Sequence, residues 1–159
     1  MFIDQTLVFD MGSYTATTGL VGANQYASSA TNTSTNILDM QQRRDLGGGL
    51  DGGFEVTANF LITTAFSGGT SVNFQLQGST DNTTWTTYSE TGAIAVASLG
   101  ANVSLNLPVP AVTPDGGLSP RYYRTAYVNA GANTAGAVIA WLGPRSTLRF
   151  YPPGVVVNN

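Results

Sequence analysis

Apolar and polar residues alternate along much of the chain, and this alternation is its strongest pattern. From 54 to 63 every second residue is apolar, and the same holds from 72 to 77, with a Ser-Gly-Gly turn at 67–69 between the two segments. A period of two places one face of a β-strand against a core and the other face in water. The sequence therefore predicts a hairpin of two half-buried strands that ends in a polar tip at residues 78–82.

Two more strands are predicted after this hairpin. Trp85 and Tyr88 lie in a Thr-rich segment that follows the polar tip and ends at Thr91-Gly92. Apolar residues alternate again from 103 to 109, but Pro108 interrupts them. Because proline cannot donate to a ladder of backbone hydrogen bonds, this strand is predicted to lie at a sheet edge or to end there.

The last third of the chain adds the segments with the clearest faces. A loop rich in proline and glycine, residues 110–120, leads into a predicted strand at 121–128. In the segment from 136 to 142, Ile139 and Trp141 share one face, and Val138 and Leu142 share the other. A strand with two apolar faces is typical of a central position in a sheet that is covered on both sides.

The two ends of the chain have weaker patterns. Residues 2–9 and 37–40 are predicted as short strands, residues 12–35 as an extended arm or loop of small polar residues, and residues 152–159 as an extended tail. About seven or eight strands in one domain, residues 1–159, fit an all-β, two-sheet antiparallel β-sandwich of jelly-roll type. The pattern does not define the strand order.

Composition agrees with an all-β chain and removes most catalytic chemistry. Only 9% of residues are charged and lysine is absent, so the Glu- and Lys-rich composition of helical proteins is missing. The chain has no cysteine and no histidine, which excludes thiol nucleophiles, thiolate metal sites and the commonest general base. We therefore expect no enzyme, no cofactor and no metal site.

Charge and hydropathy exclude further classes of partner. The formal net charge of −3 and the few scattered arginines are unsuited to a phosphate backbone, so nucleic acid is not an expected partner. The uncharged stretch 91–114 is broken by prolines and asparagines, and no membrane span is expected. The carboxylates of Asp4 and Asp10 near the start of the chain do not fit a secretory signal.

Two carboxylate pairs are the remaining candidates for catalytic or metal chemistry. Asp4 and Asp10 on one extended strand would lie about 20 Å apart, which is too far for a glycosidase pair. Asp45 and Asp51 lie among glycines, but their spacing matches no established calcium loop. Neither pair is expected to form a site.

A charged cluster beside a triple glycine, at residues 39–49, is the most distinctive local feature. Arg43, Arg44 and Asp45 stand together there. Arginine suits interfaces because its planar guanidinium binds carboxylates in a bidentate way and loses less on desolvation than lysine does. One interpretation makes the cluster an interface with another chain. The other makes it a solvated loop whose arginines pair with Asp39 and Asp45.

Six aromatic residues have two possible roles. They could form a stacking platform for sugars, but aromatic residues at alternating positions of an all-β chain usually fill the space between two sheets. The core interpretation is therefore favoured. The few charges leave a surface poorly suited to a solitary soluble protein, so much of it is expected to be covered by partners. The six residues are Trp85, Tyr88, Tyr122, Tyr123, Tyr127 and Trp141.

Three segments, taken together, resemble a known family. They are the Arg-Arg-Asp-Leu-Gly loop at 43–47, the Phe-Gln-Leu-Gln-Gly-Ser-Thr-Asp-Asn hairpin at 74–82 with Trp85 after it, and the Arg-Tyr-Tyr-Arg string at 121–124 followed by the 136–142 strand. Over residues 37–142 the chain resembles the tailed-phage capsid cement, or decoration, proteins of the Bordetella podophage jelly-roll type.

The resemblance implies a non-enzymatic structural virion protein on the outer surface of an icosahedral capsid, made in the host cytoplasm. Its partners would be the major capsid protein, whose neighbouring copies it clamps, and itself, as a homodimer or homotrimer. The alternative, from another class, is a carbohydrate- or receptor-binding β-sandwich adhesion module. The candidate interface residues are Arg43, Arg44, Asp45, Arg121 and Arg124.

Overall fold

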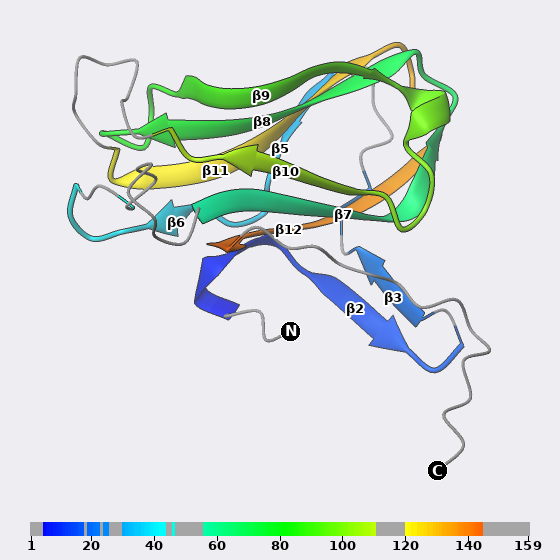
Figure 1. The fold of residues 1–159 in the computed structure, drawn as a ribbon, viewed down its shortest axis with the longest axis horizontal. Coiled ribbons are helices and arrows are strands. Elements are labelled where there is room, and N and C mark those ends of the chain that lie inside the picture. The colour runs from blue at the N-terminus through cyan, green and yellow to red at the C-terminus, as the bar shows by residue number, and fades with distance from the viewer. Residues whose placement is uncertain are drawn as a thin grey trace.

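The computed structural model describes residues 5–17, 19–22, 24–25, 30–43, 46, 56–110 and 120–144, and all facts below concern these residues. The described chain is almost entirely β-structure (Figure 1). It contains two single 3₁₀ turns, η1 (Gln5–Leu7) and η2 (Val96–Ser98), and no α-helix within the described ranges. The predicted tail at 152–159 lies outside the described residues.

Two antiparallel sheets form the sandwich. Sheet 1 has the order β1 (Val8–Asp10), β12 (Ala135–Pro144), β7 (Val56–Ser67) and β10 (Ser104–Pro108), and β4 (Asn24–Gln25) also pairs with β12. Sheet 2 has the order β5 (Thr31–Thr33), β11 (Tyr122–Ala130), β8 (Ser71–Ser79) and β9 (Thr86–Ala95), and β6 (Leu38–Asp39) also pairs with β11.

The connectivity is that of a jelly roll. Because β5 and β6 both pair with β11, on the side away from β8, they act as one interrupted strand. With β5 and β6 counted as one strand, and with the short strands β2, β3 and β4 left aside, eight strands run in the order first, eighth, third, sixth in sheet 1 and second, seventh, fourth, fifth in sheet 2. Among these eight strands, only the β8–β9 connection stays within one sheet. The predicted hairpin of residues 54–63 with residues 72–77 is therefore wrong, because the turn at 67–69 carries the chain from β7 in sheet 1 to β8 in sheet 2. The predicted two-sheet jelly-roll sandwich is confirmed, and the structure adds the strand order.

The core lies between the sheets and is centred on interlocked aromatic rings. Phe60 of β7 packs edge-on against Phe74 of β8 with ring centroids 5.4 Å apart, and Tyr127 of β11 lies 5.6 Å from Phe74 in the same manner. All three side chains are fully buried. Edge-to-face pairs of this kind stabilise a core by about 0.5–1.5 kcal/mol each beyond the burial of their area.

Several strand predictions can be compared directly with the structure. The segment with two apolar faces is β12, which lies between β1 and β7 as predicted for a central strand. Pro108 closes β10, the edge strand of sheet 1, also as predicted. The predicted end of the third strand at Gly92 is wrong, since β9 continues to Ala95. Gly92 has a positive φ of 71° and allows a bulge, so the pairing with β8 shifts register and then resumes.

The predicted arm or loop at residues 12–35 carries short strands where the structure describes it. β2 (Gly12–Thr15) and β3 (Gly19–Gly22) form a hairpin against the sandwich on the side of β7 and β12 (Figure 1). The amide of Gly22 donates to Thr63 Oγ1 of β7 at 2.7 Å. A Cβ on Gly22 would lie only 2.6 Å from the carbonyl oxygen of Val138, so glycine permits this close approach.

Candidate protein-interaction surface

The outer faces of the two sheets carry different side chains. On sheet 1, Val8, Leu61, Ile139 and Trp141 form an apolar cluster on the side away from the main core, and each is at most 6% exposed. On sheet 2, the outward positions of β8 and β9 are mostly polar and half-buried. We call this outward surface of sheet 2 the polar face. Its side chains used below are Asn73, Gln75, Gln77, Trp85, Thr87, Glu90 and Arg124.

A continuous chain of hydrogen bonds crosses the polar face. Glu90 Oε2 accepts from Asn73 Nδ2 at 2.8 Å and from Gln75 Nε2 at 3.0 Å. Gln75 Oε1 accepts from Gln77 Nε2 at 3.0 Å, and Gln77 Oε1 accepts from Arg124 Nε at 2.8 Å. The chain links β9, β8 and β11 from a carboxylate to a guanidinium. Each glutamine donates toward the carboxylate and accepts from the guanidinium side, so the direction of both amides is set by the charges at the ends.

Arg124 is held in place from a second side. Its guanidinium carbon lies 4.1 Å from the centroid of the Trp85 ring, which is a close cation–π contact. Trp85 precedes β9, and Arg124 lies on β11, so the contact spans the end of β8 between them. The hydrogen bond to Gln77 and the stacking on Trp85 together fix the orientation of the guanidinium plane.

Both charges of the polar face are present at neutral pH. Hydrogen bonds from Asn73 and Gln75 hold the pKa of Glu90 below its ordinary value. Partial burial lowers the pKa of the Arg124 guanidinium, which nevertheless stays protonated because arginine titrates only above about pH 12. No other charged residue occurs in β8, β9 or β11.

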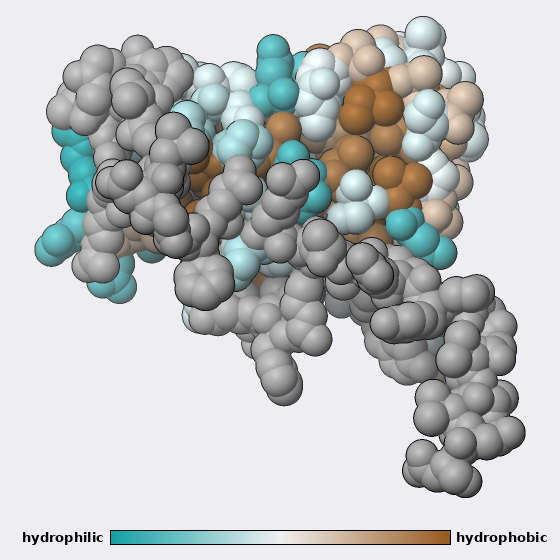
Figure 2. All heavy atoms as spheres, in the orientation of Figure 1, coloured by the Kyte–Doolittle hydropathy of each residue, from teal (hydrophilic) through white to brown (hydrophobic). Residues whose placement is uncertain are grey.

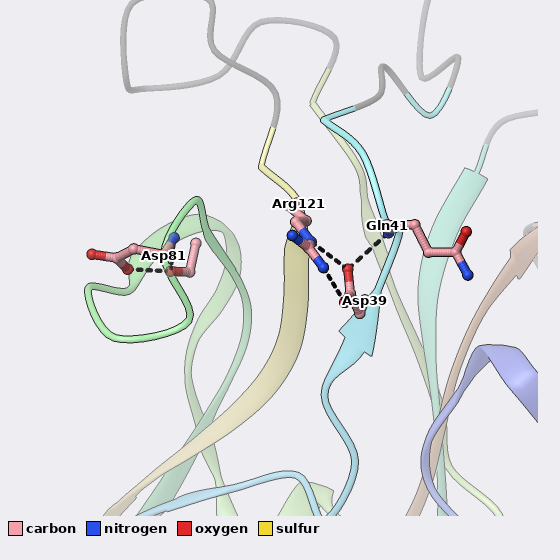
Figure 3. Close-up of polar contacts among 5 residues, drawn as sticks. Asp39, Gln41, Asp81 and Arg121 are labelled. Carbon is pink, nitrogen blue, oxygen red and sulfur yellow. Dashed lines mark hydrogen bonds and ion pairs between the residues drawn. The ribbon is translucent and has the colours of Figure 1, made fainter.

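Arg121, one of the predicted interface residues, binds a carboxylate of its own chain. Its Nε and Nη2 donate to Asp39 Oδ1 and Oδ2, each at 2.7 Å, in a bidentate ion pair that joins β6 to the start of β11 (Figure 3). Both side chains are 40% exposed. The guanidinium, with a smaller contribution from the backbone N–H of Gln41, holds the pKa of Asp39 below its ordinary value. Arg121 also stacks on Tyr122, with its guanidinium carbon 4.9 Å from the ring centroid.

Asp81 closes the polar tip predicted at residues 78–82. Its Oδ1 accepts from the backbone N–H groups of Thr84 at 2.7 Å and Thr83 at 2.8 Å, and from the Ser79 hydroxyl at 2.9 Å. These bonds to the charged form hold the pKa of Asp81 far below its usual range. Asn82 follows with a positive φ of 60°, which asparagine tolerates. Asp81 therefore acts as the cap of a tight turn.

The remaining charged candidates are placed as follows. Arg43 is exposed, while Arg44 and Asp45 lie outside the described residues. Asp4 and Asp51 also lie outside them, so neither predicted carboxylate pair is described as a whole. The solvated-loop interpretation assigns two carboxylates to Arg43 and Arg44: that of Asp39 is bound by Arg121, and that of Asp45 lies outside the described residues.

Asp10 is fully buried and joins the two sheets. Its Oδ2 accepts from the hydroxyl of Tyr127 at 2.6 Å, and its Oδ1 accepts from the backbone N–H of Thr35 at 2.9 Å and from the Thr35 hydroxyl at 3.1 Å. Asp10 belongs to β1 of sheet 1 and Tyr127 to β11 of sheet 2. The carboxylate therefore stabilises the contact between the sheets.

The six aromatic residues do not form a continuous stacking platform. Tyr123 and Tyr127 are at most 3% exposed and belong to the core between the sheets, as the core interpretation predicts, whereas Trp141 is buried on the outer side of sheet 1. Trp85 and Tyr122 each carry an arginine guanidinium on the ring. The remaining tyrosine, Tyr88, is half-buried and packs against Tyr123, with ring centroids 6.5 Å apart.

Apolar surface gathers along the edge where β9 and β10 lie side by side. Figure 2 shows hydrophobic side chains at this edge, toward the end of the sandwich that carries η2. They are partly buried and pack against the main core. We call this surface the apolar edge. It comprises Ile94, Val96, Val103 and Leu105.

An apolar cavity of about 260 Å³ opens at one end of the sandwich. Its walls come from η1, from the segment after β6 and from the ends of β7 and β12. Its lining offers almost no polar surface and no group suited to orient a polar ligand. The lining residues are Leu7, Met40, Leu46, Val56, Leu142, Gly143 and Pro144.

Sequence reasoning missed most of the polar face. Arg124 was a candidate, but Gln75, Gln77 and Glu90 were not, although they stand at polar positions of strands predicted by alternation. Two glutamines separated by one residue in a strand point to the same side, and this spacing was the available signal. The partners of these side chains on neighbouring strands depended on the register.

Within the described ranges, no three carboxylate residues are grouped so that they could hold a metal ion. No helix of the described chain has the length and apolar character needed to cross a membrane.

Fold and surface together define a small jelly-roll β-sandwich with one covered sheet and one broad polar sheet face. A model of the Bbp16 family matches residues 12–142, which is most of the chain, and the chain belongs to the Bbp16 family. Bbp denotes Bordetella bacteriophage, so the family is one of phage proteins. A search of the curated proteins finds no match.

Proposed function

We propose that this protein decorates and cements an icosahedral phage capsid by binding neighbouring copies of the major capsid protein from outside. The observation that carries the proposal is the membership of a phage-protein family on a jelly-roll fold. The surface supports it, because a sandwich with few charges, a polar face and an apolar edge offers several areas for protein contact.

The mechanism needs no catalytic group. A cement protein resists internal pressure by burying surface against several subunits at once, and each weak contact counts many times when many copies bind one shell. The proposed partners are the major capsid protein and a second or third copy of this chain. We assign no role to a cofactor, a nucleic acid or a membrane.

Two areas are proposed to contact the capsid protein. The first is the segment around the exposed Arg43, with Arg44 and Asp45 beside it in the sequence. The second is the apolar edge, since strands at the margins of two sheets combine apolar side chains with unpaired backbone groups. The bidentate Arg121–Asp39 pair is a link within the chain, and we assign it no contact with the capsid protein.

The experiment is reconstitution on capsid shells that lack any decoration. Purified protein is mixed with such shells, and bound protein is measured by co-sedimentation and located by cryo-electron microscopy. We expect saturable binding at symmetry-related positions outside the shell. The double variant Arg43→Ala/Arg44→Ala should bind about tenfold more weakly or worse. Absence of binding by the wild type would overturn the proposal.

The alternative, a carbohydrate- or receptor-binding module, is tested in parallel. Glycan-array binding by the isolated protein, together with absence of shell binding, would establish the alternative. The geometry gives it less support, because three of the six aromatic residues are buried and two others carry an arginine. We therefore expect the array to show no specific glycan.

A further inference from the structure

The polar face carries two charges of opposite sign, each with unused capacity for hydrogen bonds. Arg124 has five N–H donors, and one of them, on Nε, is bound by Gln77. Among the described residues, no acceptor is bound by its two Nη nitrogens. Glu90 accepts both of its hydrogen bonds at Oε2, and no described residue donates to Oε1.

The free groups are held in fixed positions. The amide chain through Gln75 and Gln77 connects the two charges, and Trp85 supports the guanidinium from the other side. Little side-chain freedom remains to be lost when a partner binds, which favours association. Tryptophan and arginine are also the residue types that most often dominate the binding energy of protein interfaces.

The arrangement of the charges is self-complementary. Glu90 lies on β9 and Arg124 lies on β11, with Gln75 and Gln77 of β8 between them. A two-fold axis in the plane of contact, perpendicular to the line from Arg124 to Glu90 and crossing it midway, would place each Arg124 opposite the Glu90 of another copy. The amides of Gln75 and Gln77 lie on either side of this axis, so they would come near the amides of the second copy.

We infer that the polar face is a homotypic surface, through which two copies of this chain pair face to face by reciprocal Arg124–Glu90 contacts. This inference rests on the proposed function, which includes a homo-oligomer, and it identifies the surface through which the copies would pair. A second copy is the occupant because the face holds one charge of each sign and no excess of either.

The size of the face sets the expected strength. β8, β9 and β11 are nine or ten residues long. Three such strands cover about 30 Å by 15 Å, or about 900 Å² for two copies, which is below the usual size of a stable interface. Pairing in solution is therefore weak and concentration-dependent, and it strengthens where copies are held close together on a lattice.

The test is a pair of charge reversals. Arg124→Glu leaves two carboxylates on the face, and Glu90→Arg leaves two guanidinium groups. Each variant alone would place like charges opposite each other twice, so self-association should weaken about 100-fold or more. In an equal mixture, one variant offers two carboxylates and the other two guanidinium groups. Both contacts between them then join opposite charges, so a heterodimer should form.

Masses are measured by sedimentation velocity over a concentration series, with circular dichroism to verify the fold of each variant. Ser98→Glu and Ser98→Arg are matched controls, because Ser98 is exposed on η2 outside the polar face, and they should associate like the wild type. The inference is overturned if the wild type stays a monomer throughout. It is also overturned if the reversals leave its self-association unchanged, or if their mixture does not associate.

The shell experiment separates this inference from the proposed function. Shell binding by a wild-type protein that stays monomeric in solution would overturn the homotypic surface and leave the cement proposal intact. Pairing without any shell binding would do the reverse. If Arg124→Glu loses shell binding while its self-association is unchanged, the polar face binds the capsid protein and the homotypic inference is wrong.

Discussion

Sheet 1 and sheet 2 pack on one shared core, but their outer faces differ. The outer face of sheet 1 carries a buried apolar cluster, and that of sheet 2 is mostly polar and half-buried. Sheet 1 buries Val8, Leu61, Ile139 and Trp141 on its outer side and has the β2–β3 hairpin beside it. Sheet 2 leaves its outer side open and joins polar side chains there into a hydrogen-bonded chain. Truncation of an outward side chain is therefore expected to cost more stability on sheet 1, while the outer side of sheet 2 is suited to present a surface to a partner.

The sharpest test of this comparison is a pair of truncations on the two outer faces. Trp141→Ala on sheet 1 should lower the free energy of unfolding by about 3–5 kcal/mol, because it empties a buried aromatic site. Gln75→Ala on sheet 2 should lower it by about 1 kcal/mol or less, the usual net contribution of a hydrogen bond near the surface. Urea denaturation followed by circular dichroism measures both, and equal losses would refute the contrast.

The link between the sheets should be the next most sensitive feature. Asp10→Asn replaces one of two buried acceptor oxygens by an NH2 group, which then faces a donor, either the Tyr127 hydroxyl or the backbone N–H of Thr35. We expect a loss of about 1–3 kcal/mol in the same denaturation experiment. Tyr127→Phe removes the same bond from the other side, so the double variant should lose less than the sum of the two. Strict additivity would show that the bond does not couple the sheets.

One added methyl group can disturb the packing of the β2–β3 hairpin against sheet 1. Gly22→Ala would bring a Cβ within 2.6 Å of the Val138 backbone, and backbone cannot move aside cheaply. We expect a loss of about 1–3 kcal/mol and faster amide exchange in β3 and β12. Gly100→Ala is the control, since nothing lies within 4 Å of a Cβ there and its exchange should be unchanged.

The smallest expected effect lies at the end of sheet 2 and depends on pH. The folded-state pKa of Asp81 is lowered, so its contribution to stability is complete above the unfolded value near about 4 and is lost as the pH falls toward the folded value. Asp81→Asn keeps an acceptor oxygen for the turn but removes the titration.

Melting temperatures between about pH 7 and pH 2 measure this contribution. The Asn variant should melt close to the wild type at neutral pH and lose less stability on acidification. If both proteins lose the same amount, the turn carries none of the acid sensitivity.

The sequence predicted the features whose signal is local. Two apolar faces placed the β12 segment at the centre of a sheet, and Pro108 placed β10 at an edge, because burial and proline geometry act on the strand itself. The short strands β2 to β5 escaped prediction, because segments of two to four residues are too short to show a period.

The interaction surface was less predictable for a related reason. Arg121 and Asp39 are far apart in the sequence, and only the antiparallel pairing of β6 with β11 brings them together. The same holds for Glu90 and Arg124, whose connection depends on the register of β8 against both neighbours. The charged residues could be counted from the sequence, but their pairing could not be assigned.

The jelly-roll order also has a consequence for how the chain must fold. In sheet 1, β12 lies between β1 and β7, and Val8 pairs with Trp141. Strand β1 therefore finds its neighbour only after nearly the whole described chain has been synthesised, although β8 and β9 can pair as a local hairpin much earlier. Contacts between such distant residues slow folding, because a long loop must close before they gain any stability. Closure of sheet 1 by β12 is thus a late step of folding. Until β12 pairs with it, β1 lacks its partner strand on its apolar side.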